Sequence, residues 1–263
     1  MSNGVSRIVV GLIGLPIVLT TVYYGGWLLF ALAAVAAAIA LHEYWLLARP
    51  LAPLAPAGYI GAALALVGAE MGGVGWMLGG VLTTFLFAFA LKAISEARQA
   101  ATIAISGTVM GALWVGGGLS FLVLLRELPE HGRLAAFSVL LAVWAGDTFA
   151  YAGGRLVGRH KMAPKTSPGK TWEGFVFGTA ATLFVAFVTF YKQDFLTIGQ
   201  SLVVGAVVAV AAPVGDLFES MLKRDMDVKD TGTLLGGHGG MLDRTDALLF
   251  AAPAVYFTIL AFS

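Results

Sequence analysis

Two short segments hold most of the residue types that could bind a phosphate group or a metal ion. The first, GGRLVGRHKMAPKTSPGKTWEG at 153–174, mixes cations with hydroxyl groups and glycines. The second, KRDMDVKDTGTLLGGHGGMLDRTD at 223–246, combines carboxylates, cations and several glycines around His238. Cations, hydroxyl donors and free backbone amides bind phosphates, whereas carboxylate oxygens suit a hard divalent cation such as Mg²⁺. The two segments therefore predict phosphate chemistry assisted by a metal ion.

Acidic side chains also lie within or at the ends of strongly apolar runs. They are Asp147, Asp216, Glu219, Asp243 and Asp246. An ionised Asp inside a membrane costs on the order of 3 kcal/mol, so such acids are interpreted as functional and a partner is expected nearby. Asp147 and Tyr151 are one helical turn apart, and Asp216 begins a polar stripe that continues with Glu219, Ser220 and Lys223. These carboxylates would repel one another without cations, which favours a shared metal site.

Simpler explanations remain open for single residues. Asp147 alone would serve as a structural acid bonded to Tyr151 or to a neighbouring helix. Asp243 would cap the helix that follows it, and Lys223 and Arg224 would anchor a helix at the membrane boundary. The basic segment 155–171 would bind anionic lipid. A metal-and-phosphate site explains all of these residues together.

Two common nucleotide and metal motifs are excluded. The GKT at 169–171 resembles the end of a Walker A motif, but Pro164 stands where that motif needs Gly and no strand precedes it. Ser167 and Pro168 instead predict a helix start, where free amides would bind an anion. His238 has no cysteine to join it in a zinc site, so we expect it to donate to a phosphate or a base.

The composition requires a bilayer as solvent. Of 263 residues 59% are hydrophobic and only 12% are charged, and the mean hydropathy is +0.87. Sixteen basic residues nearly balance fifteen acidic ones, so nothing indicates a nucleic-acid partner. The absence of cysteine excludes disulfides, thiolate metal sites and a cysteine nucleophile. The first apolar run lacks a small-residue cleavage pattern and is predicted to be a retained span.

The apolar runs predict an all-α, polytopic membrane protein. Helices are expected because such runs satisfy their backbone internally and lack the alternation of barrel strands. With roughly 20 residues needed per span, nine candidates are found, at about 5–24, 26–48, 57–70, 73–91, 103–125, 134–154, 172–191, 196–222 and 245–262.

The distribution of basic residues predicts the orientation of these spans. With the N terminus in the cytoplasm, 13 of the 16 Lys and Arg residues lie on the cytoplasmic side. The other three are Arg126, Arg133 and Lys192. Both charged segments then face the cytoplasm. We expect one membrane domain over 1–263, with N-terminal helices at 1–133 and a catalytic part at 134–263 that contains both segments.

The second segment resembles a known family signature. The run SMLKRDMDVKDTGTLLGGHGGMLDRTD, from Ser220 to Asp246, is similar to the signature of CDP-diacylglycerol synthases, also called phosphatidate cytidylyltransferases, and fills each of its specified positions. Common members have Pro near Gly236, where Gly is an accepted variant. The upstream runs GDTFAYAGGRLVGRHK at 146–161 and SPGKTWEG at 167–174 also match. The resemblance covers the chain from about 140 onward in motif detail and the rest by hydrophobic pattern.

The resemblance implies a polytopic, commonly dimeric enzyme of phospholipid biosynthesis. Such enzymes condense CTP with phosphatidic acid to give CDP-diacylglycerol and pyrophosphate. In that family, acids matching Asp216 and Asp243 hold a Mg²⁺-centred site, with K⁺ as a companion ion. For this chain the resemblance therefore implies a homodimer with CTP, phosphatidic acid and membrane lipids as partners. It also implies a bacterial inner-membrane location with the site facing the cytoplasm.

The resemblance and the spacing together assign roles to individual residues. Residues expected to carry the reaction are Asp216, Asp243, Lys223, Arg224, Lys229, Asp230, His238, Arg244 and Asp246. Those expected to bind substrate are Asp147, Tyr151, Lys165, Ser167, Lys170, Thr171, Glu173, Gly239 and Gly240. Mg²⁺ is assigned to Asp216 and Asp243, and the geometry extends the metal set to Glu219, Asp246 and Asp147. Which segment holds which substrate is left open by the sequence.

Three other functions are compatible with parts of the pattern. A CTP-dependent lipid kinase of the polyprenol type would transfer the γ-phosphoryl group, but the full match from Ser220 to Asp246 argues against it. An ion-coupled transporter would place acids near mid-membrane and show inverted repeats. Here most acids lie at one face beside basic segments. A scaffold that has lost activity is disfavoured because no catalytic-looking position is missing.

Overall fold

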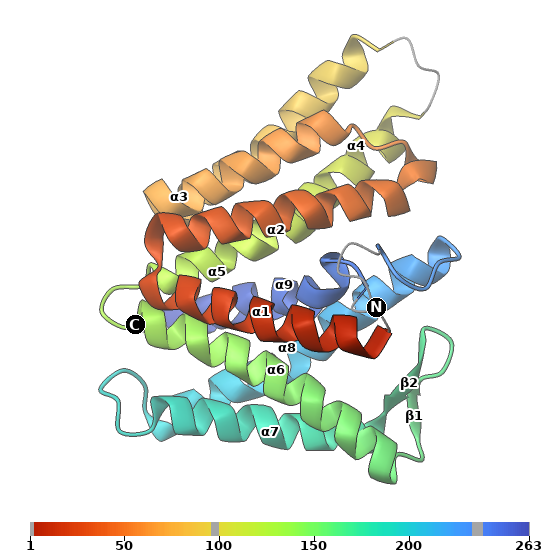
Figure 1. Ribbon diagram of the computed structural model, residues 1–263. Coiled ribbons are helices and arrows are strands. Elements are labelled where there is room, and N and C mark those ends of the chain that lie inside the picture. Colours follow the sequence, from red (N-terminus) through yellow and green to blue (C-terminus); the bar gives the residue numbers. More distant parts are fainter. Residues whose placement is uncertain (1–2, 96–99, 233–238, 263) are drawn as a thin grey trace. The chain divides into compact units, whose positions relative to one another are not determined.

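The computed structural model describes residues 3–95, 100–232 and 239–262 (Figure 1). Within these ranges the regular elements are helices, apart from one short hairpin, and this confirms the expected all-α class. Contacts divide it into two compact units, which are described separately. One unit comprises residues 1–127 and 228–245, and the other comprises residues 128–227 and 246–263.

The first unit contains the helices of the N-terminal half. They are α1 (Asn3–Tyr24), α2 (Gly26–Leu47), the 3-10 turn η1 (Arg49–Leu51), α3 (Ala55–Ala93), α4 (Ala101–Gly111), the π-helical η2 (Ala112–Gly117) and α5 (Gly118–Arg126). Gly25 separates α1 from α2 with φ of 70°, a value that favours glycine. Close to Gly25, Arg126 donates from Nε to the carbonyl of Val22 at 2.8 Å and so caps the end of α1.

Helix α3 is two antiparallel segments joined at Gly73. Gly73 has φ of 73° and ψ of −163°, which interrupts the helix. The segments before and after it pack together closely, because a side chain at Gly61 would strike Thr84 and one at Gly80 would strike the backbone at Ala65. Small residues permit such contact in a bilayer. The predicted break between 57–70 and 73–91 is thereby confirmed, and Figure 1 shows the chain reversing here.

Tyr44 fixes α2 against α4. Its side chain is buried, and its hydroxyl donates to the carbonyl of Gly107 at 2.8 Å. A side chain at Gly111 would occupy the space of the Tyr44 ring. The ring also packs edge-on against Trp114 of η2, with centroids 6.2 Å apart. Glu43, the next residue toward the N terminus, is thus carried on a rigid part of α2.

The second unit contains most of the C-terminal half. Its elements are α6 (Gly132–Val157), β1 (Lys161–Ala163), β2 (Ser167–Thr171), α7 (Trp172–Phe190) and α8 (Ile198–Asp225). Helix α9 (Leu242–Leu260) begins in the first unit and continues in the second. Helices α6 and α7 meet along small residues spaced by four, namely Gly146, Ala150 and Gly154 on α6 and Gly174, Gly178 and Thr182 on α7. Larger residues at these positions would push the two helices apart.

The first basic segment forms a hairpin, not a helix start. Strands β1 and β2 pair antiparallel, with Lys161 opposite Thr171 and Ala163 opposite Ser167. The helix expected at Ser167 begins instead at Trp172, because the Thr171 hydroxyl accepts a hydrogen bond from the Gly174 amide at 3.1 Å. The prediction of a helix start at Ser167-Pro168 is therefore wrong, since the stronger cap lies four residues later.

The helices suit a membrane protein. Within the described residues, six are long and apolar enough to cross a bilayer, and a shorter apolar helix covers 11–24. Their bounds agree with the predicted spans to within a few residues. Together with the composition, this establishes an integral membrane protein of helical type.

The α3 hairpin offers a test of its close packing. We expect Gly80→Ala to destabilise the protein by about 1–3 kcal/mol, because the new methyl group would strike the facing backbone. The adjacent Gly79 faces open space, so Gly79→Ala should leave stability unchanged or raise it by up to about 1 kcal/mol through helix propensity. Thermal unfolding of both purified variants in detergent measures the difference. Equal effects of the two substitutions would contradict the packing.

Candidate functional site

The polar stripe on α8 is a connected set of side chains. Glu219 is 1% exposed and pairs with Lys223, whose Nζ lies 2.7 Å from Oε2. Ser220 donates to Asp216 at 3.3 Å. Both contacts join residues four apart, as the spacing predicts. Because Glu219 is buried in an apolar helix bundle, this cation offsets part of the cost of burying its carboxylate.

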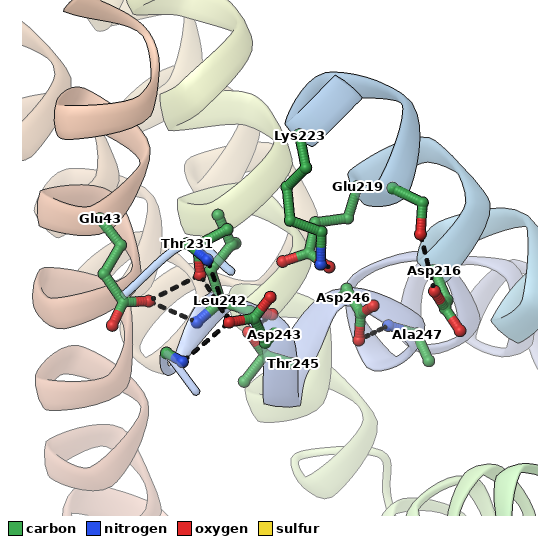
Figure 2. A network of polar contacts seen from close by, with 12 residues as sticks. Glu43, Asp216, Glu219, Lys223, Thr231, Leu242, Asp243, Thr245, Asp246 and Ala247 are labelled. Carbon is green, nitrogen blue, oxygen red and sulfur yellow. Dashed lines mark hydrogen bonds and ion pairs between the residues drawn. The ribbon is translucent and has the colours of Figure 1, made fainter. Parts of the chain in front are cut away.

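Asp246 joins this stripe from α9. Its carboxyl group is 8% exposed and lies beside those of Glu219 and Asp216 (Figure 2). Gly215 makes the approach possible, because a side chain there would strike the carbonyl of Asp246. The structure thus brings together three of the five predicted acids, all within the second unit.

Lys170 connects the hairpin to the same acids. Its ammonium group lies 2.9 Å from Asp216 Oδ2 and donates to the carbonyl of Pro213 at 3.2 Å. Arg224 also reaches the hairpin, since its Nε donates to the carbonyl of Thr166 at 3.3 Å. Three carboxyl groups thus lie close to two ammonium groups, and a further cation bound here would offset the repulsion among the carboxyl groups.

Glu173 binds the backbone just before the first strand of the hairpin. Its carboxylate accepts hydrogen bonds from the amides of Arg159 at 3.1 Å and His160 at 3.2 Å. It also contacts His160 Nδ1 at 2.6 Å. Thr171 caps α7, as described above. The geometry gives both residues a structural task, and their predicted contact with substrate stays a prediction.

Other predicted substrate residues lie at the surface of the second unit. Lys165 is exposed at the tip of the hairpin, and Ser167 is half-buried in β2. The Tyr151 hydroxyl accepts a hydrogen bond from Arg155 at 2.8 Å, so this tyrosine has a partner one turn along α6. Asp147 is exposed and lines a small cavity of about 30 Å³. These positions are accessible to a ligand.

In the first unit, two carboxylates bind the second glycine-rich segment. Asp243 accepts hydrogen bonds at Oδ2 from the amides of Gly240 at 2.8 Å and Thr231 at 3.2 Å, and from the Thr231 hydroxyl at 3.0 Å. Glu43 of α2 accepts from the amide of Met241 at 3.0 Å. It also accepts from the amide of Leu242 at 2.8 Å (Figure 2). The consecutive amides at 240–242 are therefore bonded to carboxylates of the chain itself. Asp243 lies in the first turn of α9, and the helix start itself is capped by Glu43.

The described glycines of this segment make room for these carboxylates. A side chain at Gly232 or Gly240 would collide with the carboxylate of Glu43. Gly239 has φ of 81°, and a side chain there would lie 2.8 Å from Asp243 Oδ2. The sequence predicts that these glycines admit a ligand closely. In the structure, a side chain added at these glycines would meet Glu43, Thr231 or Asp243.

Glu43 and Thr231 were missed by the sequence reasoning. A usable signal existed for Glu43, because HEYW places a carboxylate inside the predicted span 26–48, where acids are costly. Thr231 carries no comparable signal, since a threonine in a polar loop is unremarkable. Its importance comes only from its position between two carboxylates.

The remaining predicted residues are placed as follows. Lys229, Asp230 and Arg244 are exposed in the first unit, and His238 lies outside the described residues. Asp216 and Asp243 belong to different units, so their pairing at one metal ion stays a prediction. Among the described residues, no three His, Asp or Glu side chains are arranged to hold a metal ion. Mg²⁺ commonly takes only one or two protein carboxylates, so a smaller ligand set fits its chemistry.

The fold and these clusters define a class of protein: a polytopic helical membrane protein whose buried acids are paired with lysines or with backbone amides. Comparison with known proteins identifies the group within this class. A model of the cytidylyltransferase family matches residues 5–262. The chain belongs to this family.

Several relatives carry the name phosphatidate cytidylyltransferase. The chain is 42% identical to that of Haemophilus influenzae over 130 residues, which cover 48% of the chain and 45% of the relative. It is 42% identical to that of Staphylococcus haemolyticus over 146 residues, 55% of each chain. It is 36% identical to that of Bacillus subtilis over 155 residues, 59% of the chain and 58% of the relative. The matched segment thus spans about half the length of each relative.

The buried pair on α8 makes a prediction about stability. Lys223→Met should lower the free energy of unfolding by about 3–5 kcal/mol, because Glu219 loses the cation that compensates its burial. Adding Glu219→Leu should recover most of this loss, since apolar side chains then replace the whole pair. Thermal or denaturant unfolding of the single and double variants measures these differences in stability. A double variant less stable than Lys223→Met would contradict the pairing.

Proposed function

We propose that the protein transfers the cytidylyl group of CTP to phosphatidic acid, which yields CDP-diacylglycerol and pyrophosphate for phospholipid biosynthesis. The observation that carries the proposal is the family match over residues 5–262. The relatives named phosphatidate cytidylyltransferase support the choice of substrates, although the matched segment spans only about half of each. The acid and lysine cluster of the second unit supplies suitable groups for phosphate chemistry.

The reaction needs no nucleophile from the protein. An oxygen of the lipid phosphate attacks the α-phosphorus of CTP, a new P–O bond forms, and the bond to the bridging oxygen of the leaving pyrophosphate breaks. Catalysis then depends on holding the two phosphates in line and on neutralising negative charge. We assign this work to the cations Lys170, Lys223, Arg224, Lys229 and Arg244. Arg224, Lys229 and Arg244 are exposed, so they can contact a ligand at the proposed cytoplasmic surface of the membrane.

We propose Mg²⁺ as the metal, with Asp216 and Asp243 as its protein ligands and K⁺ as a second cation. Both residues offer carboxylate oxygens, which hard cations prefer. The Asp216 side chain is 38% exposed and already accepts one cation, the ammonium group of Lys170. When bound, Mg²⁺ would neutralise charge on the phosphoryl oxygens and on the leaving group. Glu219, Asp246 and Asp147 remain candidate additions to this set.

We further propose nine spans with the N terminus in the cytoplasm of a bacterial cell and the protein in its inner membrane. The six long helices support this count when the α3 hairpin is taken as two spans and α1 and α9 are added. The excess of Lys and Arg on one side supports the orientation. The catalytic part is proposed to be 134–263, and the family resemblance supports a homodimer.

Single cysteines test this topology, because the chain has no native cysteine to give background labelling. Lys192→Cys should react with a membrane-impermeant maleimide added to intact cells, since residue 192 lies on the proposed outer side. Lys165→Cys should react only after the membrane is permeabilised. The reverse pattern would overturn the orientation, and labelling of both in intact cells would overturn the span count.

The reaction itself is tested with purified protein in detergent, Mg²⁺, phosphatidic acid and CTP labelled at the α- or the γ-phosphate. We expect the α label to enter the lipid, with release of pyrophosphate. Entry of the γ label would identify a CTP-dependent lipid kinase. Entry of neither label under these conditions would overturn the proposal and direct attention to ion binding by the acids.

Asp243→Asn serves as the matched negative variant in this assay. We expect it to remain folded and inserted, because the amide oxygen still accepts hydrogen bonds from Gly240 and Thr231. Activity should fall by at least about 100-fold if the carboxylate binds the metal. Turnover near that of the unsubstituted protein would remove Asp243 from the metal site.

A further inference from the structure

Glu43 is a buried acid that the proposed reaction does not use. It lies on α2 with only 4% of its surface exposed. Its Oε1 accepts a hydrogen bond from the Met241 amide at 3.0 Å, and Oε2 accepts one from the Leu242 amide at 2.8 Å. These amides are among those that a helix leaves without partners at its start. A carboxylate at this position also suits the positive end of the α9 dipole.

Thr231 connects Glu43 to Asp243. Its hydroxyl lies 3.4 Å from Glu43 Oε2 and 3.0 Å from Asp243 Oδ2, and its amide donates to the same Oδ2 at 3.2 Å. The hydroxyl has a single proton, so it can donate to only one carboxylate at a time. The two carboxylates are therefore held beside the same threonine, and a shift of one changes the hydrogen bonding of the other.

The backbone of the segment is shaped around the Glu43 carboxylate. A side chain at Gly232 would lie 2.5 Å from Oε1, and one at Gly240 would strike Oε2. The chain thus passes closely on both sides of the carboxylate, at points 8 residues apart. Such contact fixes the path of the backbone into α9 as well as its first hydrogen bonds.

Glu43 is itself held rigidly. The neighbouring Tyr44 is anchored to Gly107 by its hydroxyl, and Trp45 is packed against Gly58 and Gly111. Both aromatic residues are buried. The carboxylate therefore acts as a fixed point to which Thr231, Met241 and Leu242 are attached, although about 190 residues of sequence separate them from Glu43.

We propose that Glu43 is a positioning residue for the cytidylyltransferase reaction. By binding the amides at the start of α9, its carboxylate sets the direction in which Asp243 presents its own carboxylate to the metal. The N-terminal helices thereby take part in catalysis without touching substrate. This role rests on the function proposed above, whereas the anchoring of the segment by Glu43 can be measured independently of activity.

The kinetic test compares Glu43→Gln and Glu43→Ala with Glu70→Gln. Glu70 is a matched control, because it is another acid within an apolar helix of the same unit and its electrostatic neighbour is Glu127, which lies outside the second segment. In the Glu43 variants kcat should fall roughly 10- to 100-fold, and the Mg²⁺ concentration for half-maximal activity should rise by a similar factor. Glu43→Gln should be the milder change, since its amide oxygen still accepts one hydrogen bond. For Glu70→Gln, both kcat and the half-maximal Mg²⁺ concentration should stay within about twofold of the values for the unsubstituted protein.

The Mg²⁺ dependence separates positioning from simple stabilisation. A merely structural role would reduce the amount of active protein and leave the half-maximal Mg²⁺ concentration unchanged. Wild-type values of both kcat and Mg²⁺ dependence in folded Glu43 variants would overturn the proposal. A reduced kcat with unchanged Mg²⁺ dependence would overturn it too.

Hydrogen–deuterium exchange tests the anchoring directly. In the Glu43→Ala variant, peptides that cover 239–245 should exchange roughly fivefold to tenfold faster, because the Met241 and Leu242 amides lose their acceptor. The exchange rate of peptides from α4 should not change in this variant. In Glu70→Gln, the exchange rate of peptides that cover 239–245 should not change either. Unchanged exchange at 239–245 would overturn the anchoring.

These measurements distinguish failure of the proposed function from failure of the anchoring role of Glu43. If the unsubstituted protein does not make CDP-diacylglycerol, the proposed function fails, and exchange still decides whether Glu43 anchors the segment. If Glu43→Ala does not fold, Glu43→Gln and Thr231→Val take its place, since the valine keeps the Thr231 amide and removes only the hydroxyl. Failure of all three variants to fold would show that Glu43 holds the unit together as a whole, and it would overturn a separate positioning role.

Discussion

The structure depends on the constraint that a carboxylate in apolar surroundings must have hydrogen-bond donors or cations around it. The chain meets this constraint in two ways. In the second unit, lysines neutralise the acids of α8, as in the pairs Glu219–Lys223 and Asp216–Lys170. In the first unit, backbone amides at the start of α9 satisfy Glu43 and Asp243. Each solution fixes a polar group in place, which the proposed reaction between two phosphates would require.

The two solutions have different chemical consequences. A lysine beside a carboxylate can exchange for another cation, so Asp216 keeps the capacity to accept a metal ion. Backbone amides are fixed to the chain, so the hydrogen bonds that Glu43 accepts hold the start of α9 in place. The described glycines of the second segment fit this arrangement. Gly232, Gly239 and Gly240 leave the space that carboxylates of the chain occupy, which explains the need for glycine at these positions.

Much of the fold follows from the sequence because membrane helices are determined by local hydropathy. The break at Gly73 and the stripe on α8 were both predicted, since each depends on neighbours within one or two turns. The hairpin at 161–171 was not predicted, because Ser-Pro is a common helix start and the competing cap at Thr171 is equally local. The contact of Glu43 with 240–242 joins distant segments, and no periodicity in one sequence reveals such a pair. An acid within a predicted span was nevertheless a sign that a partner existed.

The α3 hairpin affects how the newly made chain inserts into the membrane. Its first segment, 55–72, is about 27 Å long at 1.5 Å per residue, slightly less than the thickness of a typical hydrocarbon core. Glycine contacts between the two segments bring their backbones together along much of this length. The first segment is therefore short for entering the bilayer alone, whereas the joined pair presents a compact apolar surface. The two segments are therefore suited to leave the translocon together, with the turn at Gly73 leading across the membrane.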